Sequence, residues 1–369
     1  MGKSAKKRKK TVKPARRPVR VAATSARAKA KSRAAKSSRP KGPSPKPVVI
    51  DFHAHIVVPE VLDFTYEHSL FAQAVAGPAQ GGRPAALGEE FRARMTDMAL
   101  RLRDMDQMGV DIQVISPSIL QQCTYFAEPE AALKMERLGN ERVAEAVAKH
   151  PDRLVGLGSV PMQDSALAAQ ELERCVKQLG LKGAIIGSLV NGAEVGDERF
   201  RPFWANAEAL GAAIFIHPAG SPDPRMRKHR LLITLGQPLE EAFAQSSLVY
   251  EGVMDAFPKL KVVFAHGGGF LPFYTGRHDN DYRLGRQSKL KGDFSSYLPR
   301  FYYDTVLFNA DMLDFLATKV PTRHLLLASD YPFAEKRPVE YVRRAKRISK
   351  KDQDAILGAN CARVLGISI

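Results

Sequence analysis

Eight short apolar runs, separated by longer segments of helical period, constrain the fold of this chain more than any other feature. The runs occupy residues 48–55, 110–116, 154–160, 183–188, 212–218, 262–267, 301–306 and 324–330. Between them, in segments such as 130–149 and 163–179, Leu, Val, Ala and Met recur every three or four residues, which is typical of amphipathic helices. Eight strand and helix repeats over about 320 residues predict a parallel (β/α)8 barrel of the TIM type, an α/β fold. A doubly wound open sheet is the alternative.

The first run, VVIDFHAH, contains three ionisable side chains, Asp51, His53 and His55. With the period of two of an extended chain, these three point to one face of the strand and Phe52 points to the other. A single buried histidine usually packs in a core. Two imidazoles aimed from one strand at one point favour a metal ion, because neutral imidazole is a common metal ligand. The motif alone is weak, and it needs partners from elsewhere in the chain.

Polar residues also end three of the later runs. His217 ends the fifth run, His266 the sixth and Asp330 the eighth. In a (β/α)8 barrel the C-terminal ends of all strands form one catalytic face, so these side chains become neighbours of those in the first run. Core packing does not explain so regular a placement, and the sequence therefore predicts a metal-binding barrel. The HGGG segment at 266–269 lacks the GxGxxG spacing of a dinucleotide-binding loop.

The first 47 residues differ sharply in composition from the rest. They contain 18 Lys and Arg residues and no Asp, Glu or aromatic residue, whereas the whole chain has 56 Lys and Arg against 39 Asp and Glu. We therefore expect residues 1–47 to be a disordered basic arm and residues 48–369 to be a nearly neutral barrel. Such an arm is predicted to bind nucleic acid or other polyanions weakly. A nuclear signal at KKRKK, an organellar transit peptide and a misassigned start codon are alternative interpretations.

Cysteine usage and hydropathy bear on the compartment. The three cysteines, Cys123, Cys175 and Cys361, lie far apart without CxxC spacing. This pattern indicates a reducing compartment, and neither a disulfide framework nor a thiolate zinc site. The sequence has no run of about 18 apolar residues that would span a membrane. We therefore expect a cytoplasmic protein that does not associate with a membrane.

Six motifs along residues 48–369 carry a family resemblance. They are DFHAH at 51–55, RLRDMDQMGVDIQVIS at 101–116, FIHP at 215–218, FPKLKVVFAHGGGFLPFYTGR at 257–277, LLLASDYPF at 325–333 and ILGANCARVLGI at 356–367. In this combination the chain resembles the amidohydrolase superfamily. Within that superfamily it is similar to the branch of metal-dependent decarboxylases that includes α-amino-β-carboxymuconate-ε-semialdehyde decarboxylase.

The resemblance implies one metal site and an acid/base residue beside it. It implies that one divalent ion, Zn²⁺ or alternatively Mn²⁺, is ligated by His53, His55, His217 and Asp330. His266 would be the acid/base residue, and Asp330 would share in catalysis. Zinc held by three imidazoles and a carboxylate keeps room for water or substrate, as a catalytic site requires. Superfamily members with two metals bridge them by a carboxylated lysine late in a central strand, but Lys182 stands at the opposite end of the fourth run, so we expect one metal.

Two arginines are candidates for binding a substrate carboxylate. Arg277, eleven residues after His266, matches a family arginine that reaches the active site of the neighbouring subunit, which implies a homodimer. The guanidinium group offers the planar bidentate fork that a carboxylate needs. A solvated loop arginine is the alternative at this position. Arg92, in the segment after the first run, is a second candidate.

These implications predict an enzyme that releases CO2, without oxidation, from a small unsaturated or aromatic carboxylic acid. Hydrolysis or hydration is the alternative, because the same metal site could activate water toward a carbonyl group or a double bond. After His217 the chain reads PAGSPD, where the decarboxylase branch usually has a tryptophan, so the identity of the substrate stays open. A protein that serves mainly to bind polyanions through its arm is a third interpretation.

Overall fold

A computed structural model of the chain describes residues 46–69, 89–118, 121–221, 223–287 and 289–369. The predicted arm of residues 1–47 lies almost entirely outside the described residues. Its disorder and its separation as a domain therefore stay predictions.

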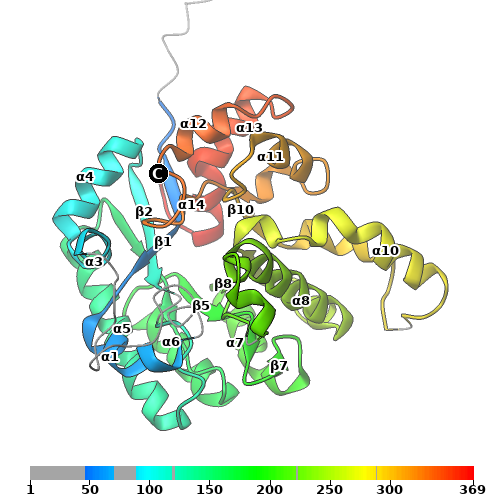
Figure 1. The fold of residues 1–369 in the computed structure, drawn as a ribbon, viewed down its shortest axis with the longest axis horizontal. Coiled ribbons are helices and arrows are strands. Elements are labelled where there is room, and N and C mark those ends of the chain that lie inside the picture. The colour runs from blue at the N-terminus through cyan, green and yellow to red at the C-terminus, as the bar shows by residue number, and fades with distance from the viewer. Residues whose placement is uncertain (1–45, 70–88, 119–120, 222, 288) are drawn as a thin grey trace, which may run out of the picture. The chain divides into compact units, whose positions relative to one another are not determined.

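Short parallel strands form a closed barrel, shown in Figure 1. Its strands are β1 (Ile50–Ile56), β2 (Ile112–Pro117), β3 (Leu154–Gly156), β4 (Gly158–Ser159), β5 (Gly183–Gly187), β8 (Ala213–His217), β9 (Lys261–Phe264), β10 (Tyr302–Asp304) and β11 (Leu325–Leu326). Two further strands, β6 (Leu189–Val190) and β7 (Ala193–Glu194), pair as a small antiparallel hairpin outside the barrel. Each predicted apolar run contains a strand of the barrel. The third run, residues 154–160, contains two short strands, β3 and β4. The (β/α)8 prediction is confirmed, and the open sheet is wrong.

Backbone hydrogen bonds close the barrel at two junctions. One sheet has the order β1-β2-β3 and the other has the order β11-β10-β9-β8-β5-β4. The Leu157 N–H between β3 and β4 donates to Ile115 on β2, so β3 and β4 act as one strand between β2 and β5. On the other side, the Phe52 N–H of β1 donates to the Leu327 carbonyl just after β11 at 2.8 Å. All strand C-termini therefore meet at one end of the barrel.

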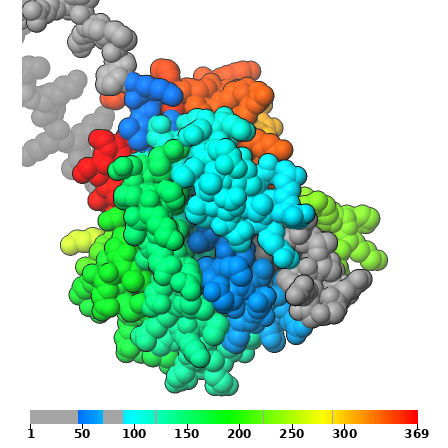
Figure 2. Space-filling view, turned by 90° about the vertical axis from the view of Figure 1, so that its left-hand side faces the viewer, coloured from blue at the N-terminus to red at the C-terminus, as the bar shows by residue number. Residues whose placement is uncertain are grey.

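Helices surround the strands and connect them. They are α1 (Pro59–Thr65), α3 (Glu89–Thr96), α4 (Met98–Met108), α5 (Pro129–Lys149), α6 (Ser165–Lys177), α7 (Arg201–Leu210), α8 (Gln237–Tyr250), α9 (Val253–Ala256), α10 (Leu271–Arg283), α11 (Ala310–Leu316), α12 (Pro338–Arg343), α13 (Lys350–Asp354) and α14 (Asn360–Leu365). Figure 2 shows the face covered by the helices of the N-terminal half. Within the described residues, no helix combines the length and the apolarity that crossing a membrane requires.

Local sequence signals set the ends of several of these helices. The Asp97 side chain accepts hydrogen bonds from two backbone N–H groups in the first turn of α4, and Asp164 does the same for α6. Such caps satisfy N–H groups that have no partner within the helix. Gly109 and Gly211 follow α4 and α7 in the left-handed conformation, with φ of 71° and 61°, which ends a helix at little steric cost in glycine.

Alternating strand residues divide into two packed groups. One group comes from strands all around the barrel and fills its interior: Ile50, Phe52, Val114, Leu157, Ile185, Ala213, Phe215, Val263, Ala265 and Leu326. The residues between them, such as Ile214, Ile216 and Phe264, belong to the larger core that includes the surrounding helices. Helix α14 packs against the interior group through Cys361 and Val364. This division follows from the period of two in a strand.

The first strand departs from this period, which corrects one sequence-based expectation. The pairing of β1 with β2 shifts register between Asp51 and Ala54, as in a β-bulge. Ile50 and Phe52 both belong to the interior group, so Asp51 between them faces away from Phe52, as predicted. The histidines do not share the face of Asp51 as predicted, because the irregularity places His53 beside the interior residue Phe215. The Asp51 carboxylate instead accepts hydrogen bonds from the side chains of Gln113 and Ser329. The bulge turns His53 and His55 toward the catalytic end and leaves Asp51 out of their group.

Candidate metal centre and active site

Five predicted site residues converge at the C-terminal end of the barrel. His53 and His55 lie on β1, His217 ends β8, His266 follows β9 and Asp330 follows β11. One ligand atom from each of His53, His217, His266 and Asp330 lies within 4.8 Å of the others. Within the described ranges this is the one group of three or more such side chains with metal-site spacing. His55 joins it, because its Nε2 is 3.3 Å from Asp330 Oδ1.

Hydrogen bonds fix which histidine nitrogens are free to bind a cation. The His53 Nδ1–H donates to the buried Asp304 carboxylate at 2.7 Å, so the lone pair of His53 lies on Nε2. That Nε2 is 2.9 Å from Nε2 of His55 and 3.2 Å from Asp330 Oδ1. Two nitrogens so close to one another and to a carboxylate need a proton or a cation among them. The donor set of imidazoles and one carboxylate fits a divalent metal ion.

Electrostatics keep the groups in the forms that bind metal. Burial lowers the pKa of His55, and burial together with the neighbouring histidines holds the pKa of His217 well below its ordinary value. Both imidazoles are therefore neutral near pH 7. Burial alone would raise the pKa of Asp330, but His53 and the other surrounding histidines outweigh it and hold that pKa well below its ordinary value. A neutral imidazole and an ionised carboxylate are the ligating forms.

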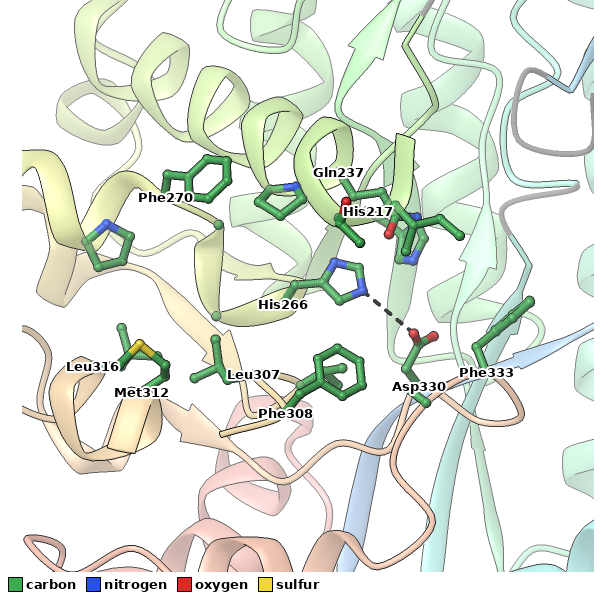
Figure 3. Close-up of a pocket in the computed structure, with 18 of the residues that line it drawn as sticks. His217, Gln237, His266, Phe270, Leu307, Phe308, Met312, Leu316, Asp330 and Phe333 are labelled. Atoms are coloured by element: carbon green, nitrogen blue, oxygen red, sulfur yellow. Dashed lines mark ion pairs between the residues drawn. The ribbon is translucent and has the colours of Figure 1, made fainter. Parts of the chain in front are cut away.

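His266 has a different partner, the Glu241 carboxylate on α8. The His266 Nδ1–H donates to Glu241 Oε1 at 2.5 Å, and the Glu241 side chain is fully buried. Burial by itself would lower the pKa of His266, but Glu241 and then Asp330 outweigh it and hold that pKa well above its ordinary value. The His266 Nε2 faces Asp330 Oδ2 at 3.7 Å, the pair marked in Figure 3. His266 therefore keeps its second ring proton more readily than a free imidazole does.

The backbone carrying these residues is unusual. His266 and Asp330 both have positive φ, 46° and 54°, a left-handed conformation that is uncommon outside glycine. The glycines after His266 allow the chain to turn tightly, and a Cβ at Gly269 would collide with the Pro238 carbonyl at the start of α8. The HGGG segment therefore serves close packing of backbone against α8, which also carries Glu241.

Sequence reasoning missed Asp304 and Glu241. Asp304 ends β10, the seventh strand, so the strand-end pattern that identified His217 and Asp330 could also have found it. It additionally accepts from the Gly267 N–H at 3.1 Å and so joins His53 to the segment after His266. Glu241 lies within a helix, and no spacing in the sequence distinguishes it from its neighbour Glu240.

A cavity of about 790 Å³ opens onto this centre, as Figure 3 shows. Its polar lining consists of His55, His217, His266, Asp330, Arg230, Thr234 and Gln237. Most of the remaining lining is apolar or aromatic, including Phe91, Ile233, Phe270, Leu307, Phe308, Met312, Phe315 and Phe333. A few polar groups in a largely apolar cavity of this size are typical of a site for a small organic ligand.

The two predicted substrate arginines do not line this cavity among the described residues. Arg92 lies on α3 and Arg277 on α10, and both are exposed. Helix α10 also carries Phe273 and Tyr274, whose exposed fractions are 65% and 52%. The described lining of the cavity therefore does not include Arg277, and its predicted role across a subunit interface stays a prediction.

The fold and this centre place the protein in a known class. The sequence profile of the Amidohydrolase family matches residues 50–367, and the chain belongs to that family. A curated relative, the 2-amino-3-carboxymuconate-6-semialdehyde decarboxylase of Dictyostelium discoideum, is 34% identical over 75% of this chain and 79% of its own length.

Solved structures agree with this assignment. The 5-carboxyvanillate decarboxylase of Sphingomonas paucimobilis superimposes with a TM-score of 0.78 at 28% identity, covering 87% of this chain and 99% of that one. The dihydroxybenzoic acid decarboxylase of a Polaromonas species, with bound manganese and 2-nitroresorcinol, gives a TM-score of 0.74 at 26% identity, covering 87% and 97%.

Proposed function

We propose that the protein is a metal-dependent lyase that removes CO2, without oxidation, from a small aromatic or otherwise unsaturated carboxylic acid. The observation that carries this proposal is the placement of one proton-donating histidine, His266, beside a group suited to one metal ion at the end of an apolar cavity. The similar proteins act on 2-amino-3-carboxymuconate-6-semialdehyde, 5-carboxyvanillate and dihydroxybenzoic acid, and their names state decarboxylation in each case.

One divalent ion would be held by His53, His55, His217 and Asp330. When bound, it supplies positive charge that holds oxygen atoms of the substrate and stabilises negative charge formed during the reaction. We propose Zn²⁺, because three nitrogens and one carboxylate oxygen suit zinc. The Polaromonas relative contains manganese, so Mn²⁺ is the alternative. Elemental analysis of freshly purified protein distinguishes the two.

The residues around the cavity divide the remaining work. The aromatic walls, with Phe91 and Phe333 on one side, exclude water and bind a planar ring. His266 donates its Nε2 proton to the ring carbon that bears the carboxylate. The bond between that carbon and the carboxylate then breaks, its electron pair restores conjugation in the ring, and CO2 leaves. Glu241 keeps the Nδ1–H of His266 oriented, which points Nε2 toward Asp330 and the cavity.

A direct test separates decarboxylation from the hydrolytic and hydrating alternatives. Metal-loaded protein is incubated with dihydroxybenzoic, carboxyvanillic and muconate-type acids in water enriched in ¹⁸O. We expect CO2 release in proportion to product, and no incorporation of ¹⁸O into the product. Product that carries ¹⁸O without release of CO2 would instead identify a hydrolase or hydratase.

Further features belong to the same proposal. We propose a homodimer in which Arg277 binds the substrate carboxylate of the partner subunit, supported by the exposed aromatic residues beside it on α10. Arg92 stays a second candidate for that role. The three cysteines are free, which supports a cytoplasmic location. Residues 1–47 would add weak binding to nucleic acid or other polyanions.

A further inference from the structure

A polar stripe faces the otherwise apolar side of the cavity. It consists of Arg230, Thr234 and Gln237, at positions i, i+4 and i+7 along the segment that leads through η4 (Leu232–Gly236) into α8. All three residues line the cavity, although Arg230 precedes the helical segment. The opposite side of the cavity is formed by aromatic and aliphatic residues such as Phe308 and Met312, labelled in Figure 3.

Gln237 shows that the stripe is open to a ligand. The residue is 8% exposed and its amide makes no hydrogen bond to any residue that the structure describes, but the amide atoms are not among the polar atoms sealed from solvent. Water that enters the cavity can satisfy such an amide, and a polar group of a ligand can replace that water. The Gln237 side chain lines the cavity, so a polar group of a bound ligand can supply the missing partner.

Arg230 supplies the charge of the stripe. Among the described residues that line the cavity it is the one Lys or Arg, and no described carboxylate forms an ion pair with it. It is exposed, so solvent reaches it. His229 and Arg230 have φ of 53° and 57°, two consecutive left-handed residues where the chain turns into η4. Such a conformation costs roughly 1–2 kcal/mol per residue and is found where the surrounding structure requires it.

We propose that Arg230 and Gln237 recognise a second polar substituent of the substrate, so that the preferred substrate is an aromatic acid with a second anionic group. The metal centre and His266 engage the carboxylate that leaves. Arg230 would pair with the other anionic group, because a guanidinium binds a carboxylate through two parallel hydrogen bonds. Gln237 would bond to a hydroxyl or amino group on the same ring.

This inference rests on the proposed function, because it assigns the substrate class of the same cavity. The test therefore measures binding and not turnover. Dissociation constants of benzoate, isophthalate and terephthalate for the metal-loaded protein are measured by calorimetry. We expect the protein to bind at least one diacid more tightly than benzoate by about 10-fold, a modest factor because Arg230 is exposed and water competes for it.

Arg230→Met should remove that preference. Arg230→Lys should retain part of it, because lysine keeps the positive charge but lacks the two parallel N–H donors of the guanidinium group. The matched control is Arg227→Met, which removes the same charge three residues earlier from an exposed arginine that does not line the cavity. It should keep the preference for the diacid. Equal affinity of the unaltered protein for diacids and benzoate, or a preference that survives in Arg230→Met, would overturn the inference.

Gln237→Met provides an independent measurement, because it keeps the length of the side chain and removes its amide. The affinity for 3-hydroxybenzoate relative to benzoate should fall, while the preference for diacids persists. An unchanged affinity ratio would remove Gln237 from the proposal. Failure of the proposed function gives a different result, in which diacids bind in an Arg230-dependent manner but no tested acid releases CO2.

Discussion

Replacement of Glu241 by Gln tests whether this buried carboxylate acts through His266. The substitution keeps an oxygen that can accept from the His266 Nδ1–H but removes the negative charge. The hydrogen bond is 2.5 Å long, its carboxylate is fully buried and the His266 side chain is 12% exposed, so water and salt screen the interaction only weakly. Hydrogen bonds to charged groups are worth about 1.5–3 kcal/mol, and turnover should therefore fall by about 10- to 150-fold.

The same substitution should also lower stability for a separate reason. Glu241 Oε2 is buried and has no hydrogen-bond partner among the described residues. The amide nitrogen of glutamine would replace either Oε1 or Oε2. In both orientations it would leave buried N–H groups without acceptors, at a cost of about 1–3 kcal/mol in the free energy of unfolding. Turnover is therefore compared well below the unfolding transition, and bound metal is measured to ensure that it stays near one equivalent.

A double-mutant cycle decides whether the two residues act together. CO2 release is measured for Glu241→Gln, for His266→Asn and for the protein that carries both substitutions. If Glu241 acts only by holding a protonated His266, its substitution should change the residual rate of the His266→Asn protein by less than about 2-fold. An equal loss in both backgrounds, or full turnover in Glu241→Gln, would refute the assignment.

Four further predictions concern the metal, stability, the dimer and the arm. His217→Ala should lower bound metal toward zero in elemental analysis while the circular dichroism spectrum stays native, because the barrel core lies beneath the site. Burial raises the pKa of Glu136 to about 8, so the folded state binds this proton more tightly than the unfolded state. Stability relative to Glu136→Gln should then be greatest below about pH 4.5 and fall by up to roughly 5 kcal/mol as pH rises through 8 in urea unfolding, whereas a constant difference would contradict this. Mixing Arg277→Ala with His266→Asn subunits should restore some turnover if Arg277 acts across the interface, and proven exchange without recovery rejects a shared site. Deletion of residues 1–47 should abolish retention on heparin at low salt but leave CO2 release unchanged.

The sequence by itself determined the barrel and the group of residues at its catalytic end. Apolar runs and helical periods are local patterns, and in a parallel barrel the position of a residue at the end of a strand also fixes its position in space. For this reason His217, His266 and Asp330 could be placed together although they are far apart in the chain. Asp304 obeys the same rule at the end of the seventh strand.

Only the tertiary structure decided which side chains support that group and which face the substrate. The bulge in β1 separated the histidines from Asp51 and placed His53 on the side of Phe52, because one irregular pair changes the face of every later residue in a strand. Glu241, Gln237 and Arg230 come from α8 and the turn before it. Their approach to the centre depends on how that helix packs over the HGGG segment, and such packing between distant segments leaves no spacing pattern in the sequence.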